Sequence, residues 1–96
     1  MKDPIETYIQ LIGTDRPGKE VITTTDLRLN NIYLTEVPEE LKFCTMPIDT
    51  MGAIQEVAGT TFKLFFSFND KYTGRTEQVS FRIRRIYFDK FFREMI

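Results

Sequence analysis

The feature that most constrains the fold is a regular alternation of apolar and polar side chains in two stretches of the C-terminal third. Residues 60–68 place four large apolar side chains on one face of an extended chain: Phe62, Leu64, Phe66 and Phe68. Residues 77–84 do the same with three: Val79, Phe81 and Ile83. Because successive side chains of a β-strand point to opposite faces, each stretch is a predicted strand with one buried face.

The segment between these two strands predicts how they pair. Residues 69–76 read Asn-Asp-Lys-Tyr-Thr-Gly-Arg-Thr, which is the composition of a connecting turn. We therefore expect an antiparallel hairpin. Eight of the nine phenylalanines lie between residues 62 and 92, and since each buried ring removes roughly 150–250 Å² from water, most of them are predicted to form the core.

The N-terminal residues predict a short helix. Asp3 is a suitable N-cap, Pro4 suits the first helical position, and Glu6 completes a capping box. Apolar residues follow at helical spacing up to Gly13, a residue type that often ends helices. These signals predict a helix over residues 4–12.

Two more helices are predicted from apolar spacing. One begins after Asp49 or Thr50 and ends at Gly59, with four side chains on one face: Met51, Ile54, Val57 and Ala58. Another begins at Asp89 as its cap and carries Phe91, Phe92, Met95 and Ile96. As an alternative, residues 82–96 form a single basic amphipathic helix that lies on a membrane or in the groove of a partner.

The stretch between the first two helices favours strands. Residues 20–37 are rich in β-branched and aromatic side chains, and Asn30-Asn31 suits a tight turn. Two strands joined at that turn are predicted, with one long irregular strand as the alternative. Residues 38–43 can form one helical turn.

These elements predict an α+β fold. The expected order is α-β-β-α-β-β-α, with about four mostly antiparallel strands and two or three short helices packed on one face of the sheet. A chain of 96 residues is long enough for one hydrophobic core and too short for two. Residues 1–96 are therefore predicted to be a single domain.

The residue counts exclude several classes of chemistry. The chain has no histidine, which rules out a Ser-His-Asp triad, a Cys-His dyad and an HExxH zinc site. Cys44 is the only cysteine, and it is interpreted as a small buried side chain rather than a nucleophile. No carboxylates have metal-ligand spacing. We expect no catalytic residues, no metal and no cofactor.

Two groups of residues are candidates for binding a partner. Three apolar or aromatic residues break the alternation and are candidates for an exposed contact patch: Phe65, Ile86 and Tyr87. Five basic residues follow the second strand: Arg82, Arg84, Arg85, Lys90 and Arg93. The charge distribution also favours this region as a binding surface. Residues 61–96 hold eight basic and four acidic side chains, whereas residues 1–60 hold five basic and ten acidic ones.

The leading functional prediction is a non-enzymatic protein-interaction module. It would act as an inhibitor, an adaptor or a small subunit of an assembly, including assemblies of phages or mobile elements, and would bind another protein, including one with an acidic surface. Nucleic-acid binding through Arg82, Arg84 and Arg85 is the second reading, although a pI of about 5.4 is low for that role. A structural homo-oligomer is the third. No apolar run is long enough to span a membrane, and a cytoplasmic location is expected.

Overall fold

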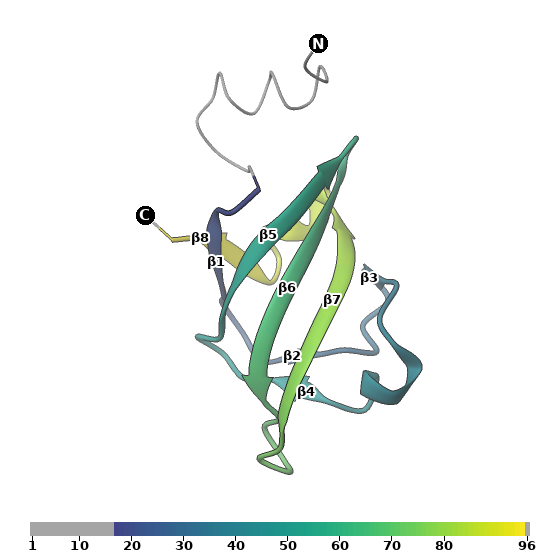
Figure 1. Ribbon diagram of the computed structural model, residues 1–96, viewed down its shortest axis with the longest axis vertical. Coiled ribbons are helices and arrows are strands. Elements are labelled where there is room, and N and C mark those ends of the chain that lie inside the picture. Colours follow the sequence, from purple (N-terminus) through teal and green to yellow (C-terminus); the bar gives the residue numbers. More distant parts are fainter. Residues whose placement is uncertain (1–16, 96) are drawn as a thin grey trace.

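The computed structural model describes residues 17–95, which form a mostly antiparallel β structure (Figure 1). Its strands are β1 (Glu20–Thr23), β2 (Leu27–Arg28), β3 (Leu34–Thr35), β4 (Thr45–Met46), β5 (Met51–Ala58), β6 (Thr61–Asn69), β7 (Thr76–Arg84) and β8 (Phe92–Glu94). Within this part of the chain the helical elements are a single turn of α-helix, α2 (Arg85–Phe88), and a 3-10 turn, η1 (Glu39–Leu41).

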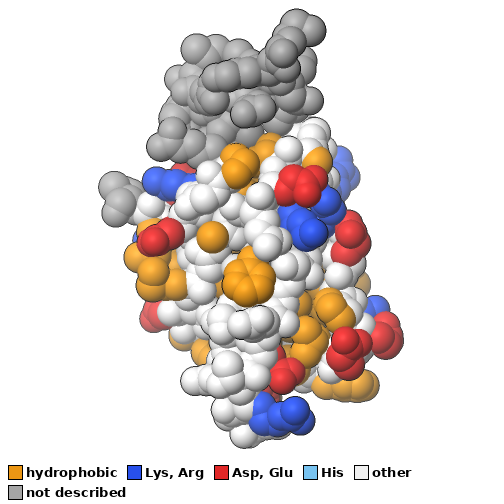
Figure 2. Space-filling model, viewed as in Figure 1, with side chains coloured by type: hydrophobic (Ala, Val, Ile, Leu, Met, Phe, Trp, Pro, Cys, Tyr) orange, Lys and Arg blue, Asp and Glu red, His pale blue; other side chains and the backbone are white. Residues whose placement is uncertain are grey.

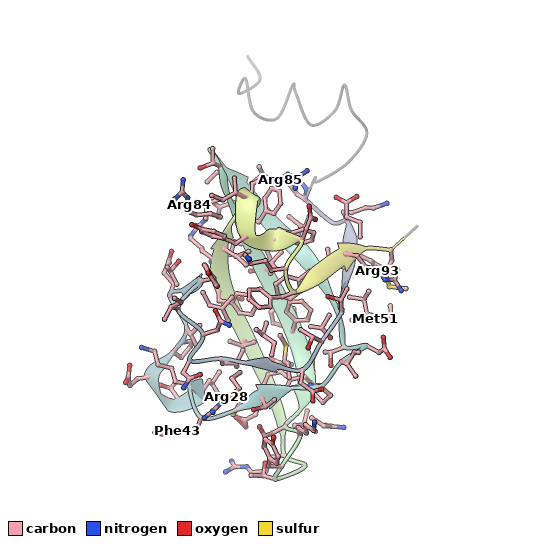
Figure 3. The ribbon with its side chains drawn as sticks, turned by 180° about the vertical axis from the view of Figure 1, so that it is seen from behind. Arg28, Phe43, Met51, Arg84, Arg85 and Arg93 are labelled. Carbon is pink, nitrogen blue, oxygen red and sulfur yellow. The ribbon has the colours of Figure 1, made fainter. Side chains whose placement is uncertain are left out.

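Six of the strands form one sheet in the order β3-β7-β6-β5-β1-β8, and β2 and β4 pair as a separate ribbon. The long strands β5, β6 and β7 form the middle of the sheet, while the ribbon and α2 lie on one side of it (Figures 1 and 3). The core fills the space between them. The opposite side of β5, β6 and β7 is called the outer face below.

The predicted hairpin is confirmed. β6 and β7 pair antiparallel, with Leu64 opposite Phe81 and Phe66 opposite Val79. Their inward side chains are almost completely buried, and the rings of Phe66 and Phe81 stack with centroids 5.8 Å apart. The alternation therefore identified both the strands and the buried face.

The predicted α+β class is wrong, and β5 shows why. The segment that suggested a helix after Asp49 is a strand with a bulge between Ile54 and Glu56. Ile54 lies opposite Leu64 and Val57 lies opposite Phe62, so an inward pair three residues apart on β5 matches a pair two residues apart on β6. The extra residue of a bulge thus produced a spacing that resembles a helix.

Gly52 lies inside the segment predicted to be a helix, and it has a clear role in the strand. It lies opposite Phe66, and a Cβ atom at this position would overlap the Phe65 carbonyl oxygen and the Phe66 ring. A glycine here allows the ring to lie against the neighbouring backbone.

The predicted C-terminal helix beginning at Asp89 is also wrong, as is the single helix over residues 82–96. The chain leaves β7, makes the single turn α2, and returns as β8, which pairs antiparallel with β1. Phe88 and Phe92 on either side of this reversal are 1% exposed. Because β1 lies about 70 residues away in the chain, no local pattern indicated this pairing.

Residues 20–37 contain strands as predicted, but these strands do not pair with each other. A turn forms at Asn31, whose backbone N–H donates to the Arg28 carbonyl oxygen over 3.1 Å. The flanking strands then diverge, because β2 pairs with β4 and β3 pairs with β7. The helical turn expected within residues 38–43 is confirmed as η1. The helix predicted over residues 4–12 lies outside the described residues.

The loop between β6 and β7 is fastened by a buried carboxylate. Asp70 is 5% exposed and accepts backbone N–H bonds from Thr45 (2.7 Å), Thr73 (2.8 Å) and Tyr72 (3.1 Å). These bonds, of which the one from Thr45 has the largest effect, hold the pKa of Asp70 below its usual value. Asp70 therefore ties the end of the hairpin to β4.

Candidate functional site

Two aromatic rings and two cations form a cluster where β7 ends. The Cζ atom of Arg84 lies 5.9 Å from the centre of the Tyr87 ring, and the Nζ atom of Lys90 lies 5.6 Å from the centre of the Tyr33 ring. The two rings contact each other with centroids 4.5 Å apart. We call Tyr33, Arg84, Tyr87 and Lys90 the aromatic–cation cluster.

The core holds one half of the cluster in place. Phe88 packs edge-on against Phe62 with ring centroids 5.5 Å apart, and it stacks on Phe92 at the same distance. These contacts anchor α2, which carries Tyr87. The Lys90 backbone N–H then donates to the Tyr87 carbonyl oxygen over 3.1 Å, which brings Lys90 back beside the same turn.

Strand pairing brings in the other half. Leu34 lies opposite Ile83 in the β3–β7 pair, so the preceding Tyr33 reaches the end of β7. The Tyr33 backbone N–H donates to the Asn31 side-chain oxygen over 2.9 Å. The Tyr33 ring also contacts the Phe91 ring, with centroids 6.0 Å apart. Residues far apart in the sequence are thus joined by tertiary structure.

The chemistry of the cluster is that of a hydrogen-bond donor. Among residues 17–95, neither Arg84 nor Lys90 forms an ion pair, and the hydroxyl groups of Tyr33 and Tyr87 make no hydrogen bond. Two cations and two phenol groups are therefore available to one ligand. At these distances each cation and its ring attract each other by about 0.5–1 kcal/mol when exposed, which favours a defined arrangement of the cluster.

Exposed apolar side chains adjoin the cluster. Ile32 is 87% exposed and precedes Tyr33, and Ile86 is 65% exposed and precedes Tyr87. Both rings are partly exposed. Aromatic rings and arginines are enriched at protein interfaces, and here they adjoin exposed apolar groups.

The structure brings together half of the eight residues predicted from the sequence. Arg84, Ile86, Tyr87 and Lys90 belong to the cluster or adjoin it. Arg85 lies on the same turn, with its Cζ atom 5.6 Å from the centre of the Phe62 ring. Tyr33 was not predicted, because nothing in the local sequence links it to β7.

Arg82 lies apart from the cluster, on the outer face. Its guanidinium contacts the carboxylates of Glu36 at 2.7 Å and Glu56 at 3.2 Å. Lys63 is its cross-strand partner on β6. Arg82 therefore belongs to a mixed-charge row, and Figure 2 shows blue and red groups side by side on this face.

Phe65 and Arg93 also lie away from the cluster. Phe65 is partly exposed on the outer face, with Ala53 and Ser80 as its cross-strand partners. Arg93 extends from β8, well separated from Arg84 and Arg85 (Figure 3). The predicted basic residues consequently form several separate groups rather than one continuous stripe.

Cys44 and the carboxylates were the other residues considered from the sequence. Burial, followed by the charge of Asp70, raises the pKa of the Cys44 thiol, which keeps the sulfur protonated. No three His, Cys, Asp or Glu side chains of these residues gather in a way that could hold a metal ion. None of the helices in this part of the chain is long and apolar enough to cross a membrane.

The aromatic–cation cluster is therefore the best-defined candidate site, and it is assigned from its own contacts. The chain matches no family model, no curated protein and no solved structure.

Proposed function

We propose that this chain is a non-enzymatic protein-interaction module that binds another protein through the aromatic–cation cluster and the adjoining Ile32 and Ile86. The observation that carries the proposal is the contact of Tyr33 with Tyr87, which gathers two cations and two phenol groups without acidic partners among the described residues. Such a surface complements a partner that supplies carboxylates and apolar side chains.

The geometry supports a protein partner better than a nucleic acid. A single-stranded nucleic acid binds by stacking its bases on open aromatic faces. Here a cation lies over each ring and the two rings contact each other, so part of each ring is already occupied by a neighbouring group. Arg82, a central residue of the nucleic-acid reading, already contacts two carboxylates.

The test is affinity capture from a lysate of the native cell with wild-type protein and the double variant Arg84→Glu/Lys90→Glu. The matched control is Arg28→Glu/Arg75→Glu, which makes the same change in net charge at the other end of β7; Figure 3 shows Arg28 far from Arg84. We expect a protein that is retained by the wild type and the control and lost from the cluster variant.

Purified partner would then be titrated by calorimetry at low and high salt, with nuclease-treated samples in parallel. We expect binding to survive nuclease and to weaken by roughly tenfold or more in the cluster variant. Capture that disappears after nuclease treatment would favour the nucleic-acid reading. Self-association measured by solution mass, lost in the cluster variant, would instead favour the homo-oligomer.

A further inference from the structure

The outer face of the sheet carries a row of neighbouring apolar side chains. Met51 and Ala53 point to this face from β5, because Gly52 between them faces the Phe66 ring on the core side. Ile22 on β1 lies opposite Met51, and Phe65 on β6 lies opposite Ala53. Side chains opposite each other in paired strands share a face. The outer apolar patch is the name used below for these four residues: Ile22, Met51, Ala53 and Phe65.

The outer apolar patch is open to solvent in part. Met51 is 50% exposed, and Phe65 and Ala53 are partly exposed. Ile22 is buried, but within the described residues it does not belong to the main core cluster. Figure 2 shows apolar groups on this face with polar and charged groups around them. An apolar centre with a polar rim is the usual anatomy of a protein interface.

The centre of the patch has a shape that can complement itself. The large Phe65 ring lies between two small cross-strand partners, Ala53 on β5 and Ser80 on β7. In a dimer with two-fold symmetry, each copy contacts the other through the same surface. Because side chains interdigitate between packed sheets, the Phe65 ring of each copy can lie over Ala53 or Ser80 of the other copy.

The charges around the patch also suit a second copy. Three basic and three acidic residues lie on the outer face or contact it: Lys63, Arg82, Arg93, Glu20, Glu36 and Glu56. A rim with both signs can complement itself, whereas a rim of one sign requires a partner of the opposite sign. The net charge of the chain is only -1, so two copies repel each other little.

The outer face has the size that a dimer needs. β6 and β7 have nine residues each. At about 3.3 Å per residue they are about 30 Å long, and four strands about 4.8 Å apart are about 20 Å wide. The flat area is therefore about 600 Å², and side-chain relief brings the accessible area toward the roughly 800 Å² per partner of a standard interface.

We infer that two copies of this chain form a symmetric dimer by packing their outer faces together, with the outer apolar patch at the centre. This inference goes beyond the proposed function, because the aromatic–cation cluster is not part of the interface. Phe65 lies opposite Ser80, whereas Arg84 ends β7 four residues later. The dimer carries two clusters, so a partner with two matching segments binds it more tightly than a monomer does.

The test is the solution mass of the full-length protein, measured by sedimentation over a range of concentrations. We expect a dimer, with Met51→Glu and Phe65→Glu each raising its Kd roughly a hundredfold or more. Met51 is 50% exposed, so its replacement should leave the fold intact, and chemical denaturation checks this. Phe43→Glu makes the same change in charge at a side chain that is 87% exposed outside the patch, and it should remain a dimer.

Crosslinking gives a second measurement that removes no apolar contact of the patch. In a Cys44→Ala background, Ser80→Cys places one thiol per copy beside Phe65. A short bismaleimide, which forms a thioether with each of two thiols, should join two copies of this variant. It should not join two copies that carry Phe43→Cys instead, since Phe43 lies near Arg28 on the other side of the sheet (Figure 3).

The outcomes separate this inference from the proposed function. A wild-type protein that stays monomeric overturns the inference, as does a dimer that Met51→Glu and Phe65→Glu leave unchanged. A dimer lost in Arg84→Glu/Lys90→Glu but kept in Met51→Glu and Phe65→Glu overturns it too, and places self-association at the cluster. If the wild type is monomeric and Phe65→Glu releases a captured protein, that protein rather than a second copy covers the outer face.

Discussion

Arg82 and Arg84 lie two residues apart on β7, yet their surroundings differ completely. Arg82 contacts Glu36 and Glu56 on the outer face, whereas Arg84 lies over the Tyr87 ring with no carboxylate partner among residues 17–95. The neighbouring strands account for the difference. Thr35, opposite Arg82 on β3, precedes Glu36, and Lys63, opposite Arg82 on β6, is itself opposite Glu56 on β5, whereas the residue opposite Arg84 is the uncharged Thr61. A basic sequence pattern thus divides into an ion-pair group around Arg82 and a group around Arg84 that we propose as the binding surface.

The largest effect on the cluster is expected from removing Phe88, the side chain that anchors α2 in the core. We expect Phe88→Ala to lower the free energy of unfolding by about 3–5 kcal/mol, because the side chain is 1% exposed and contacts Phe62 and Phe92. Chemical denaturation would measure the loss. A loss below about 1 kcal/mol would show that α2 is not held by the core. Phe88→Leu, which keeps an apolar side chain, should lose less.

A second substitution acts on the core side of the sheet, away from the cluster. We expect Gly52→Ala to destabilise the protein by about 1–3 kcal/mol, since the added Cβ atom overlaps the Phe65 carbonyl oxygen and the Phe66 ring. Partner binding, measured below the unfolding transition, should be retained because the cluster lies elsewhere. Unchanged stability would mean that β5 and β6 can separate at little cost.

The two arginines can be compared directly. We expect Arg82→Ala to cost about 1 kcal/mol, since it leaves two carboxylates without their shared cation. Arg84→Ala should cost less, at most about 0.5–1 kcal/mol from its contact with the Tyr87 ring, because Arg84 has no ion pair within the described residues. Partner binding should instead be weakened more by Arg84→Ala than by Arg82→Ala. Equal effects of the two substitutions on both stability and binding would remove the distinction.

The smallest expected effect is on the loss of stability in acid. It tests whether Asp70 or the ion pairs of Arg82 cause that loss. The pKa of Asp70 is lowered from its usual 3.8 by the backbone donors, first that of Thr45. The ionised form is therefore favoured by folding, and this stability is present above about pH 4 and lost as the pH falls through the folded pKa. Asp70→Asn should destabilise at neutral pH, and the difference from wild type should shrink in acid. If Arg82→Ala rather than Asp70→Asn reduced the pH dependence, the outer face would be responsible.

The hairpin could be predicted from sequence because its two strands lie close together in the chain and each alternates regularly. β5 could not, since its bulge spaces Ile54 and Val57 three residues apart, as in a helix. β8 could not either, because its partner strand β1 is far away in the sequence. In both cases pairing with other strands outweighed local spacing.

The candidate site was predictable in part for the same reason. Arg84, Tyr87 and Lys90 are close in sequence and were identified together from charge and aromatic content. Tyr33 enters through the pairing of β3 with β7, and the separation of Arg82 depends on Glu36 and Glu56 from two other segments. These contacts are long-range and have no signature in a single sequence.

The anchoring of α2 by Phe88 and Phe92 has a thermodynamic consequence. A single helical turn is not stable alone, so the proposed binding surface forms only when the core forms, and the two should be lost in one cooperative transition. A ligand that binds this surface must then raise the free energy of unfolding, by about 2.7 kcal/mol at a ligand concentration of a hundred times its Kd. The unfolding midpoint rises with it. The melting temperature of the protein is therefore a direct reporter of occupancy, and it can rank ligands before any partner is known.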